Sequence, residues 1–348
     1  MKAITFTGVE HLELLEVADP VLAEATDAIV EVEVAGICGS DLHPYLGREK
    51  GLDVGTVMGH EFIGRVVAVG SAVTAHKVGA RVVSPFSTNC GECWACAAGL
   101  TSRCVRGQLF GWVEKGRGLH GGQAELVRVP LADSTLIAVP DEATDLAAVM
   151  LAGDVLATAM FGAELAGVSD GDTVVVVGCG PVGLLAIRAA LARGAARVFA
   201  IDAVASRLAL ARDFGAAALS FKDGDVEARI REATDGRGAD RAIEAVGSSA
   251  ATLTAANSLR PGATIAAIGV HTEPHLALSP GELYDRNLSY SAGRCAARRM
   301  MPKAIPLAIK ETALLSRLIT HRVPITGAIA AYQSLAAREE GWGKVVIE

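Results

Sequence analysis

Apolar and polar residues alternate along much of the first third of the chain. The alternating stretches cover residues 4–8, 12–17, 28–36, 62–69, 81–84 and, after a glycine-rich link, 123–130. Because successive side chains of a strand point to opposite faces, this pattern predicts an antiparallel sheet with one buried face and one face in water. The first third is therefore predicted to be a β-rich barrel or sandwich with loops.

The pattern changes after residue 140, where an Ala-rich, apolar stretch at 146–165 is typical of helices. Apolar strands and helices then alternate up to about residue 270, which predicts a doubly wound parallel sheet. The last strand is expected to rejoin the first sheet. We therefore expect an α/β chain with a β-rich domain (1–153 and 294–348, with a cysteine lobe at 88–105) and a Rossmann domain (154–293).

Two domains agree with the length of 348 residues, since one hydrophobic core seldom grows beyond roughly 250 to 300 residues. The net charge of −7 argues against nucleic-acid and anionic-membrane partners, which need a basic surface. The start of the chain lacks the apolar segment of a secretion signal, and long uncharged runs such as 174–187 are still shorter than a membrane span. A soluble, cytoplasmic protein with a small-molecule substrate is expected.

Four of the seven cysteines lie within fifteen residues, at Cys90, Cys93, Cys96 and Cys104. Their spacing, C-x2-C-x2-C-x7-C, allows four thiolates to bind one tetrahedral Zn²⁺ and to close it to water, which is typical of a structural site. A redox pair or a disulfide-bonded loop would leave the third and fourth cysteines unexplained.

A second set of candidate ligands lies in the glycine-rich stretch 36–64. It offers a thiolate at Cys38, a hydroxyl at Ser40, an imidazole at His43, and an imidazole beside a carboxylate at His60 and Glu61. Sulfur and imidazole nitrogen together suit Zn²⁺. The alternative is a buried thiol and a hydrogen-bonded core imidazole.

A dinucleotide-binding signature follows in the second domain. Gly178, Gly180 and Gly183 form G-x-G-x-x-G between an apolar strand and a helix, and Asp202 ends the next strand nineteen residues later. Because Asp202 would bind ribose hydroxyls and repel a 2′-phosphate, NAD is favoured over NADP, and Arg207 is the nearby cation that could weaken this preference. The other expected cofactor contacts are Pro181 and Val182 in the glycine turn and Ala245 and Gly269 at strand ends.

Positive charge is concentrated between residues 294 and 303. The cations are Arg294, Arg298, Arg299 and Lys303. A solvated helix face is the ordinary interpretation of such a group, and contact with an anion or a cofactor phosphate is the alternative.

Four ordered motifs resemble those of the zinc-dependent medium-chain alcohol dehydrogenases. They are GICGSDLH at 36–43, GHEFIGRVVAVG at 59–70, the four-cysteine lobe at 90–104 and VVVVGCGPVG at 174–183. The stretches at 85–96 and 121–133 are most similar to the formaldehyde-dehydrogenase-like branch. The resemblance runs over essentially the whole chain and implies a GroES-like catalytic domain beside the Rossmann domain.

The resemblance also implies roles for individual residues. Cys38, His60 and Asp154 would bind a catalytic zinc, with Glu61 behind them or exchanging onto the metal, so that each chain would hold two Zn²⁺ ions. Asp154 directly precedes a helix, where an N-cap role competes with zinc binding. Ser40 would take the proton of an alcohol and pass it through the nicotinamide ribose to His43.

The expected function is hydride transfer between an alcohol, or an aldehyde hydrate, and NAD by a homodimer or homotetramer. Two alternatives remain open at this point. One is an NAD-binding sensor that holds one structural zinc and has no turnover. The other is a zinc-free, NADPH-dependent quinone reductase of the same superfamily. Counting the zinc bound per chain distinguishes the three.

Overall fold

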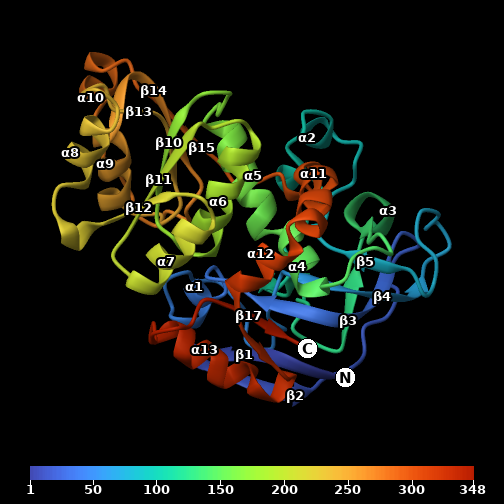
Figure 1. The fold of residues 1–348 in the computed structure, drawn as a ribbon. Helices are drawn as coiled ribbons and strands as arrows, with labels where there is room; N and C mark the ends of the chain where they lie inside the picture. Colours follow the sequence, from blue (N-terminus) through green and yellow to red (C-terminus); the bar gives the residue numbers. More distant parts are fainter. The chain divides into compact units, whose positions relative to one another are not determined.

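The computed structural model describes residues 1–348, which form two compact units. The first unit comprises Met1–Ala157 and Ala296–Glu348, and the second comprises Thr158–Cys295 (Figure 1). The sequence predicted domain boundaries after residues 153 and 293, and these boundaries remain a prediction.

The main sheet of the first unit has seven strands, of which six follow the order β16-β17-β3-β4-β5-β9 and the seventh, β8, is also paired to β3. Their bounds are β3 (Ala28–Ile37), β4 (Phe62–Val69), β5 (Arg81–Val83), β8 (Leu126–Val129), β9 (Ile137–Ala138), β16 (Ile319–Val323) and β17 (Lys344–Ile347). The C-terminal strand β17 pairs antiparallel with β3, where Val345 faces Ile37. Cys38 therefore directly follows a strand held on both sides.

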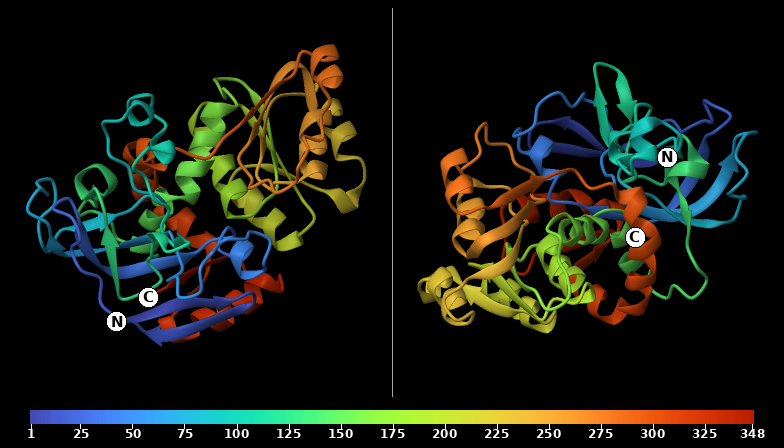
Figure 2. Two further views of the ribbon diagram at one scale, coloured as in Figure 1. Left: turned by 180° about the vertical axis from the view of Figure 1, so that it is seen from behind. Right: turned by 90° about the horizontal axis from the view of Figure 1, so that it is seen from above.

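Shorter elements surround this sheet. Two further antiparallel pairs are β1 (Lys2–Gly8) with β2 (His11–Glu16) and β6 (Trp112–Glu114) with β7 (Arg117–Leu119). The helices of the unit are α1 (Leu42–Tyr45), α2 (Trp94–Ala97), α3 (Ala132–Thr135), α4 (Leu146–Met150), α11 (Ala297–Lys310), α12 (Thr312–Leu315) and α13 (Ala328–Ala336), with 3-10 turns η1 (Thr101–Arg103), η2 (Leu151–Gly153), η4 (Ser316–Leu318) and η5 (Ile325–Gly327). Helix α13 contacts β2 and lies beside the β1–β2 pair, as the left view of Figure 2 shows.

The core of the first unit fills the space between the main sheet, the β1–β2 pair and α13. Phe62 packs edge-on against Phe110 with ring centroids 5.0 Å apart, and the fully buried Tyr332 of α13 lies 5.6 Å from Tyr45. These aromatic side chains contribute the largest apolar surfaces of the core. As the alternating pattern predicted, β3 and β4 turn apolar side chains toward this core.

The second unit contains a six-stranded, fully parallel sheet in the order β12-β11-β10-β13-β14-β15. Its strands are β10 (Thr173–Val177), β11 (Arg197–Asp202), β12 (Ala217–Ser220), β13 (Ala239–Glu244), β14 (Leu259–Ala267) and β15 (Ser289–Ala292). Its helices are α6 (Pro181–Ala192), α7 (Ala205–Asp213), α8 (Val226–Glu232), α9 (Ser249–Asn257) and α10 (Pro280–Asp285), with the turn η3 (Phe221–Asp223). This strand order confirms the predicted Rossmann fold.

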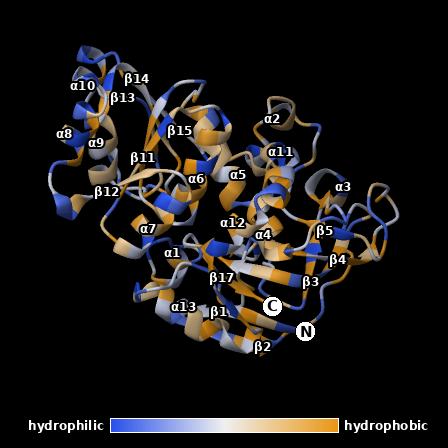
Figure 3. Cartoon of the chain, viewed as in Figure 1, coloured by the Kyte–Doolittle hydropathy of each residue, from blue (hydrophilic) through white to orange (hydrophobic).

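Helices cover both faces of the parallel sheet, with α6 and α7 on one face and α8 and α9 on the other (Figure 1). The strands are coloured mostly hydrophobic in Figure 3, in agreement with the burial of Val174–Val177 in β10. Strand order reverses between β10 and β13, and ligands of such sheets bind at the carboxyl ends of the strands at that point. The glycine motif follows β10 directly.

No single helix of the chain is long and apolar enough to cross a membrane. One pair of helical segments, Leu146–Gly153 and α5 (Val155–Leu165), has the combined length and apolar composition of a membrane span. The two segments are bent by 46° relative to each other at Asp154.

Candidate metal centres and dinucleotide site

Three candidate ligands that are far apart in the sequence meet in the first unit. Cys38 follows β3, His60 lies two residues before β4, and Asp154 occupies the break between η2 and α5. Their ligand atoms all lie within 4.8 Å of one another. The backbone at Asp154 departs from helical geometry, with φ −143° and ψ −82°, so its side chain is directed away from the path of a continuous helix.

The distances between these atoms agree with a tetrahedral zinc site. Asp154 Oδ2 lies 3.5 Å from Cys38 Sγ and 3.3 Å from His60 Nε2. A tetrahedron with Zn–S of 2.3 Å and Zn–N and Zn–O near 2.1 Å has edges of about 3.6 Å and about 3.4 Å for these pairs. The donor set of sulfur, nitrogen and oxygen therefore fits zinc in both its chemistry and its spacing.

The surroundings of the three ligands are largely excluded from water. Asp154 and His60 are each 9% exposed, and burial raises the pKa of the Cys38 thiol. Burial alone would lower the pKa of His60, but the carboxylates of Asp41 and Asp154 outweigh it and raise that pKa. The imidazole thus lies among negative groups, an environment that also favours a bound cation.

Glu61 lies outside this group of three. Its carboxylate is fully buried and forms an ion pair with Lys344, whose ammonium group also donates a hydrogen bond to the carbonyl of Ile37 at 3.2 Å. Burial lowers the pKa of Lys344, but the charge of Glu61 outweighs this effect and the pKa is raised. One carboxylate oxygen, Oε1, has no hydrogen-bond partner. Whether Glu61 exchanges onto a metal remains a prediction.

Of the two candidate proton-transfer residues, Ser40 lies on the turn between β3 and α1, and His43 lies in α1 itself. Ser40 Oγ is 3.2 Å from His60 Nε2, so this hydroxyl adjoins the ligand set. His43 lies in α1, where its Nδ1 is buried without a partner and burial lowers the pKa of its imidazole. A neutral imidazole at pH 7 can accept a proton.

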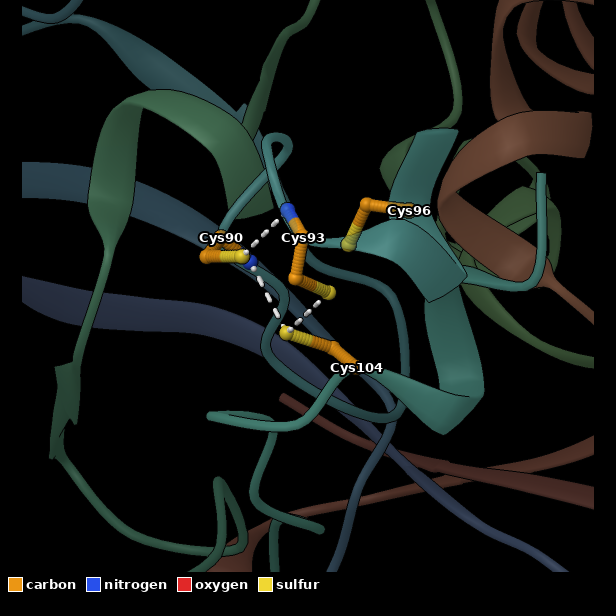
Figure 4. A group of neighbouring side chains, drawn as sticks. All are labelled: Cys90, Cys93, Cys96 and Cys104. Atoms are coloured by element: carbon orange, nitrogen blue, oxygen red, sulfur yellow. Dashed lines mark hydrogen bonds between the residues drawn. The ribbon is translucent and has the colours of Figure 1, made fainter. Parts of the chain in front are cut away.

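The four clustered cysteines form a second candidate metal centre. Their sulfur atoms lie within 4.8 Å of one another and face a common centre (Figure 4), with Cys93 and Cys104 sulfurs 3.9 Å apart. Four thiolates around one zinc would be about 3.8 Å apart. Backbone N–H groups of Cys96 and Val105 lower the pKa of Cys93 to about 6, which favours its thiolate form. Loops rather than long elements hold this lobe.

The glycine motif forms the turn between β10 and α6. Gly178 has φ +94°, a conformation that glycine adopts without strain, and a Cβ on Gly183 would overlap the carbonyl of Gly178. At Gly180, the N-cap of α6, a Cβ would meet no atom within 4 Å. Open space beside the N-terminus of a helix is the feature that a dinucleotide pyrophosphate requires.

Asp202 ends β11 and is bonded to the glycine turn. Its Oδ2 accepts the Cys179 N–H at 2.8 Å, and its Oδ1 accepts the N–H groups of Ala203 and Val204. Arg207 Nη1 lies 3.9 Å from Oδ2, so this cation adjoins the carboxylate.

The remaining expected cofactor contacts lie at the same edge of the sheet. Pro181 and Val182 form the first turn of α6, and Ala245 follows β13, where its N–H bonds to the Val177 carbonyl at 3.0 Å. Gly269 follows β14 and donates its N–H to the Glu244 carbonyl at 3.1 Å. The structure thus gathers these residues at the carboxyl ends of β10, β13 and β14.

Comparison with known proteins agrees with this architecture. Residues 24–141 match the family model of the alcohol dehydrogenase GroES-like domain, and residues 181–310 match that of the zinc-binding dehydrogenases. A medium chain reductase/dehydrogenase from Acremonium sp is 44% identical over 279 residues, or 78% of this chain and 94% of that protein. Zinc-type alcohol dehydrogenase B from Aspergillus flavus is 38% identical over 342 residues, or 96% of this chain and 78% of that protein.

Among solved structures, alcohol dehydrogenase TADH from Thermus sp. ATN1 superposes with a TM-score of 0.94 at 33% identity, covering 100% of this chain and 99% of that one. The chain belongs to the zinc-dependent medium-chain alcohol dehydrogenases. It is a zinc-dependent oxidoreductase of alcohols that uses a nicotinamide dinucleotide, and it combines a GroES-like domain with a Rossmann domain.

In this alcohol dehydrogenase, one further group of residues supports His60 and was not expected from the sequence. Asp41 Oδ1 lies 3.0 Å from His60 Nδ1, which leaves Nε2 for a metal. The other oxygen of Asp41 accepts the Cys38 N–H at 2.9 Å and the Gln123 amide at 3.3 Å, and the buried Tyr332 hydroxyl donates to Gln123 at 2.8 Å. Asp41 follows Cys38 by only three residues, so the sequence alone could have indicated a carboxylate close to the ligand turn.

Proposed function

We propose that this alcohol dehydrogenase transfers hydride between an alcohol, or an aldehyde hydrate, and NAD, with Cys38, His60 and Asp154 as the ligands of a catalytic zinc. The observation that carries the proposal is the set of ligand-atom separations of 3.5 Å and 3.3 Å, which match the edges of a tetrahedral site. Three protein ligands leave a fourth position open, as catalytic zinc sites require.

A zinc bound there would act as a Lewis acid that polarises the oxygen of the bound alcohol or aldehyde. Asp41 holds the His60 ring through Nδ1, so that Nε2 stays directed at the metal position. Ser40, 3.2 Å from His60 Nε2, is the hydroxyl placed to accept the proton of the alcohol. Ser40 must release its own proton in turn, and His43 is the imidazole that takes it up. Burial lowers the pKa of His43, so its ring is neutral at pH 7 and has a nitrogen free to accept that proton.

NAD is the proposed dinucleotide because of the charge at the end of β11. Asp202 is 8% exposed and its carboxylate accepts three backbone N–H groups, which fix it at the end of β11, where a carboxylate disfavours a 2′-phosphate. Arg207 lies 3.9 Å from this carboxylate. The carboxylate offsets part of the charge of Arg207, so the arginine is a weaker binding group for a phosphate. The open space at Gly180 supports binding of the pyrophosphate there.

We further propose a second, structural zinc held by the four cysteines of the lobe, which gives two zincs per chain. The separations of their sulfur atoms support this stoichiometry. A homodimer or homotetramer and membership of the formaldehyde-dehydrogenase-like branch remain predictions.

Metal content and turnover of two matched variants test the assignment. Asp154→Asn keeps a side chain that can cap α5 but removes the charged oxygen ligand. Asp145→Asn is the control, because Asp145 caps α4 through the N–H groups of Ala147 and Ala148 and is not among the three clustered ligands. Zinc is counted after dialysis, and turnover is followed by nicotinamide absorbance with a panel of alcohols and aldehydes, using NAD and NADP in parallel.

The proposal predicts two zincs and NAD-linked turnover in the wild type and in Asp145→Asn. Asp154→Asn should hold one zinc, with turnover lower by at least about 100-fold, the upper end of the effect of residues that only support a ligand. Two zincs and full turnover in Asp154→Asn would limit Asp154 to helix capping. One zinc and no turnover in the wild type would favour the sensor, and NADPH-linked quinone reduction without a catalytic metal would favour the reductase.

A further inference from the structure

Unpartnered polar atoms are concentrated in one region of the first unit, away from the candidate ligands of the catalytic zinc. Ten buried side-chain nitrogen or oxygen atoms of the chain have no hydrogen-bond partner, and five of them belong to four residues of this region. They are both ring nitrogens of His76, Asn89 Nδ2, Thr101 Oγ1 and Arg298 Nε. Because buried polar groups are nearly always paired, such a cluster calls for a ligand or another physical cause.

The four residues line two neighbouring cavities of about 310 and 280 Å³. His76 lines the first cavity, Asn89 and Thr101 line the second, and Arg298 of α11 lines both. Each volume is many times the ~10–15 Å³ that a single water needs and lies near the lower limit for small-ligand sites. The cavities therefore have room for a small ligand.

The groups that reach these cavities are mainly donors, and the exceptions are Asp133 in the first cavity and, in the second, Cys96, whose sulfur is one of the four proposed zinc ligands. His76 is 6% exposed and Asn89 is 2% exposed, so neither side chain can turn freely into solvent. Burial lowers the pKa of Arg298 without an opposing carboxylate. It also lowers the pKa of His76, although Asp133 and the Leu136 backbone oppose this effect. Arg298 stays charged at pH 7, whereas a neutral His76 has one N–H to donate.

The one carboxylate in the lining is already paired. Asp133 accepts hydrogen bonds from the Thr74 N–H at 2.8 Å, from the Thr74 hydroxyl at 2.8 Å and from the Ala75 N–H at 3.0 Å. These three donors lower the pKa of Asp133 against the effect of its burial. Its charge is therefore stabilised by the loop at Thr74 and Ala75, and the guanidinium of Arg298 is left to a ligand from outside the chain.

We propose that these two cavities form one binding site for a small oxyanion of the phosphate class, centred on the Arg298 guanidinium. The N–H of His76 binds the anion from one side, and the Asn89 amide and Thr101 hydroxyl bind it from the other. The planar fork of an arginine suits the oxygens of such an anion, and a bond between charged groups is stronger than a neutral one. A bound anion would connect α11 to the cysteine lobe, since Asn89 and Thr101 flank Cys90 and Cys96.

Calorimetric titration of inorganic phosphate into the zinc-loaded protein tests the site. Arg298→Met removes the central charge, and Lys303→Met is its matched control, because Lys303 is an exposed cation of the same helix. Loss of a charge-assisted hydrogen bond predicts a fall in phosphate affinity of roughly 10- to 100-fold for Arg298→Met. Lys303→Met should bind phosphate within about twofold of the wild type, as expected for a solvent-screened charge.

A second variant decides the question if Arg298→Met does not fold. His76→Leu removes two unpartnered nitrogens, so it should leave the melting temperature unchanged or higher while it weakens phosphate binding several-fold. All titrations are repeated with saturating NAD. Phosphate binding that NAD abolishes would assign Arg298 to the cofactor phosphates and overturn a separate site. No binding to the wild type, or equal binding by all variants, would mean that the cavities hold water only.

Discussion

The buried pair of Glu61 and Lys344 offers a sharp test of how the catalytic region is held together. Lys344 is 1% exposed and Glu61 is fully buried, so the pair is removed from water and from screening by salt. A Cβ on Gly36 would overlap the Glu61 carboxylate, which shows how little room that carboxylate has to move. Lys344→Met therefore leaves a buried charge that cannot turn toward solvent.

Breaking a buried ion pair by removing one partner costs about 3–5 kcal/mol, because the other charge stays desolvated. At about 2–4 °C per kcal/mol for a unit of this size, the melting temperature should fall by roughly 6–20 °C. The double variant Glu61→Gln/Lys344→Met leaves no charge behind and should recover most of this loss. Lys115→Met is the control, since Lys115 is 83% exposed beside Glu114 and its pair contributes about 1 kcal/mol or less.

Differential scanning calorimetry of the four proteins, at one pH and with zinc content matched, measures these shifts. Because the chain divides into two compact units, a single two-state transition is not assumed, and the transition that Lys344→Met shifts is the one compared among the four proteins. If Lys344→Met melts like Lys115→Met, or if the double variant melts as low as the single one, the ion pair does not hold this region. A large effect in zinc-free protein that disappears on adding zinc would instead show that Glu61 can bind the metal.

Two further predictions concern the zinc and the dinucleotide. Asp41→Asn should lower zinc affinity by roughly 10- to 100-fold, because the ligand imidazole loses the carboxylate that orients it, and competition with a chelator measures this; unchanged affinity would remove Asp41 from this role. Gly180→Ala should fold normally and bind the dinucleotide more weakly in a fluorescence titration, whereas Gly183→Ala should fail to fold because its Cβ would overlap backbone. Equal cofactor affinity in Gly180→Ala would contradict the proposed position of the pyrophosphate.

Short-range patterns in the sequence were sufficient for most of the fold. The apolar run of β10, the glycines after it and Asp202 at the end of β11 lie within thirty residues, and the structure arranges them as a Rossmann unit. The four cysteines are similarly local, and their sulfurs converge as their spacing predicted. Such features are predictable because strand period, turn chemistry and ligand spacing act between near neighbours in the chain.

The parts that sequence patterns missed depend on contacts between distant segments. Lys344 pairs with Glu61 across 283 residues, and Tyr332 reaches Gln123 across 209. In the sequence, Lys344 opens an apolar strand at the C-terminus and has the ordinary appearance of a solvated end residue. Only the pairing of β17 with β3 places its ammonium group beneath the Ile37 carbonyl, next to the ligand turn.

The same pairing explains why the site needs the end of the chain. Strand β17 lies beside the last residues of β3, so the C-terminal segment fixes the strand from which Cys38 emerges. Lys344 pairs with Glu61, which stands immediately after the proposed ligand His60, and without this cation an uncompensated carboxylate would be buried beside the proposed metal site. The discontinuous first unit is therefore a requirement of the chemistry as well as a feature of the fold: residues near 40, 60, 154 and 344 must come together before the three ligand atoms lie at zinc-binding distances.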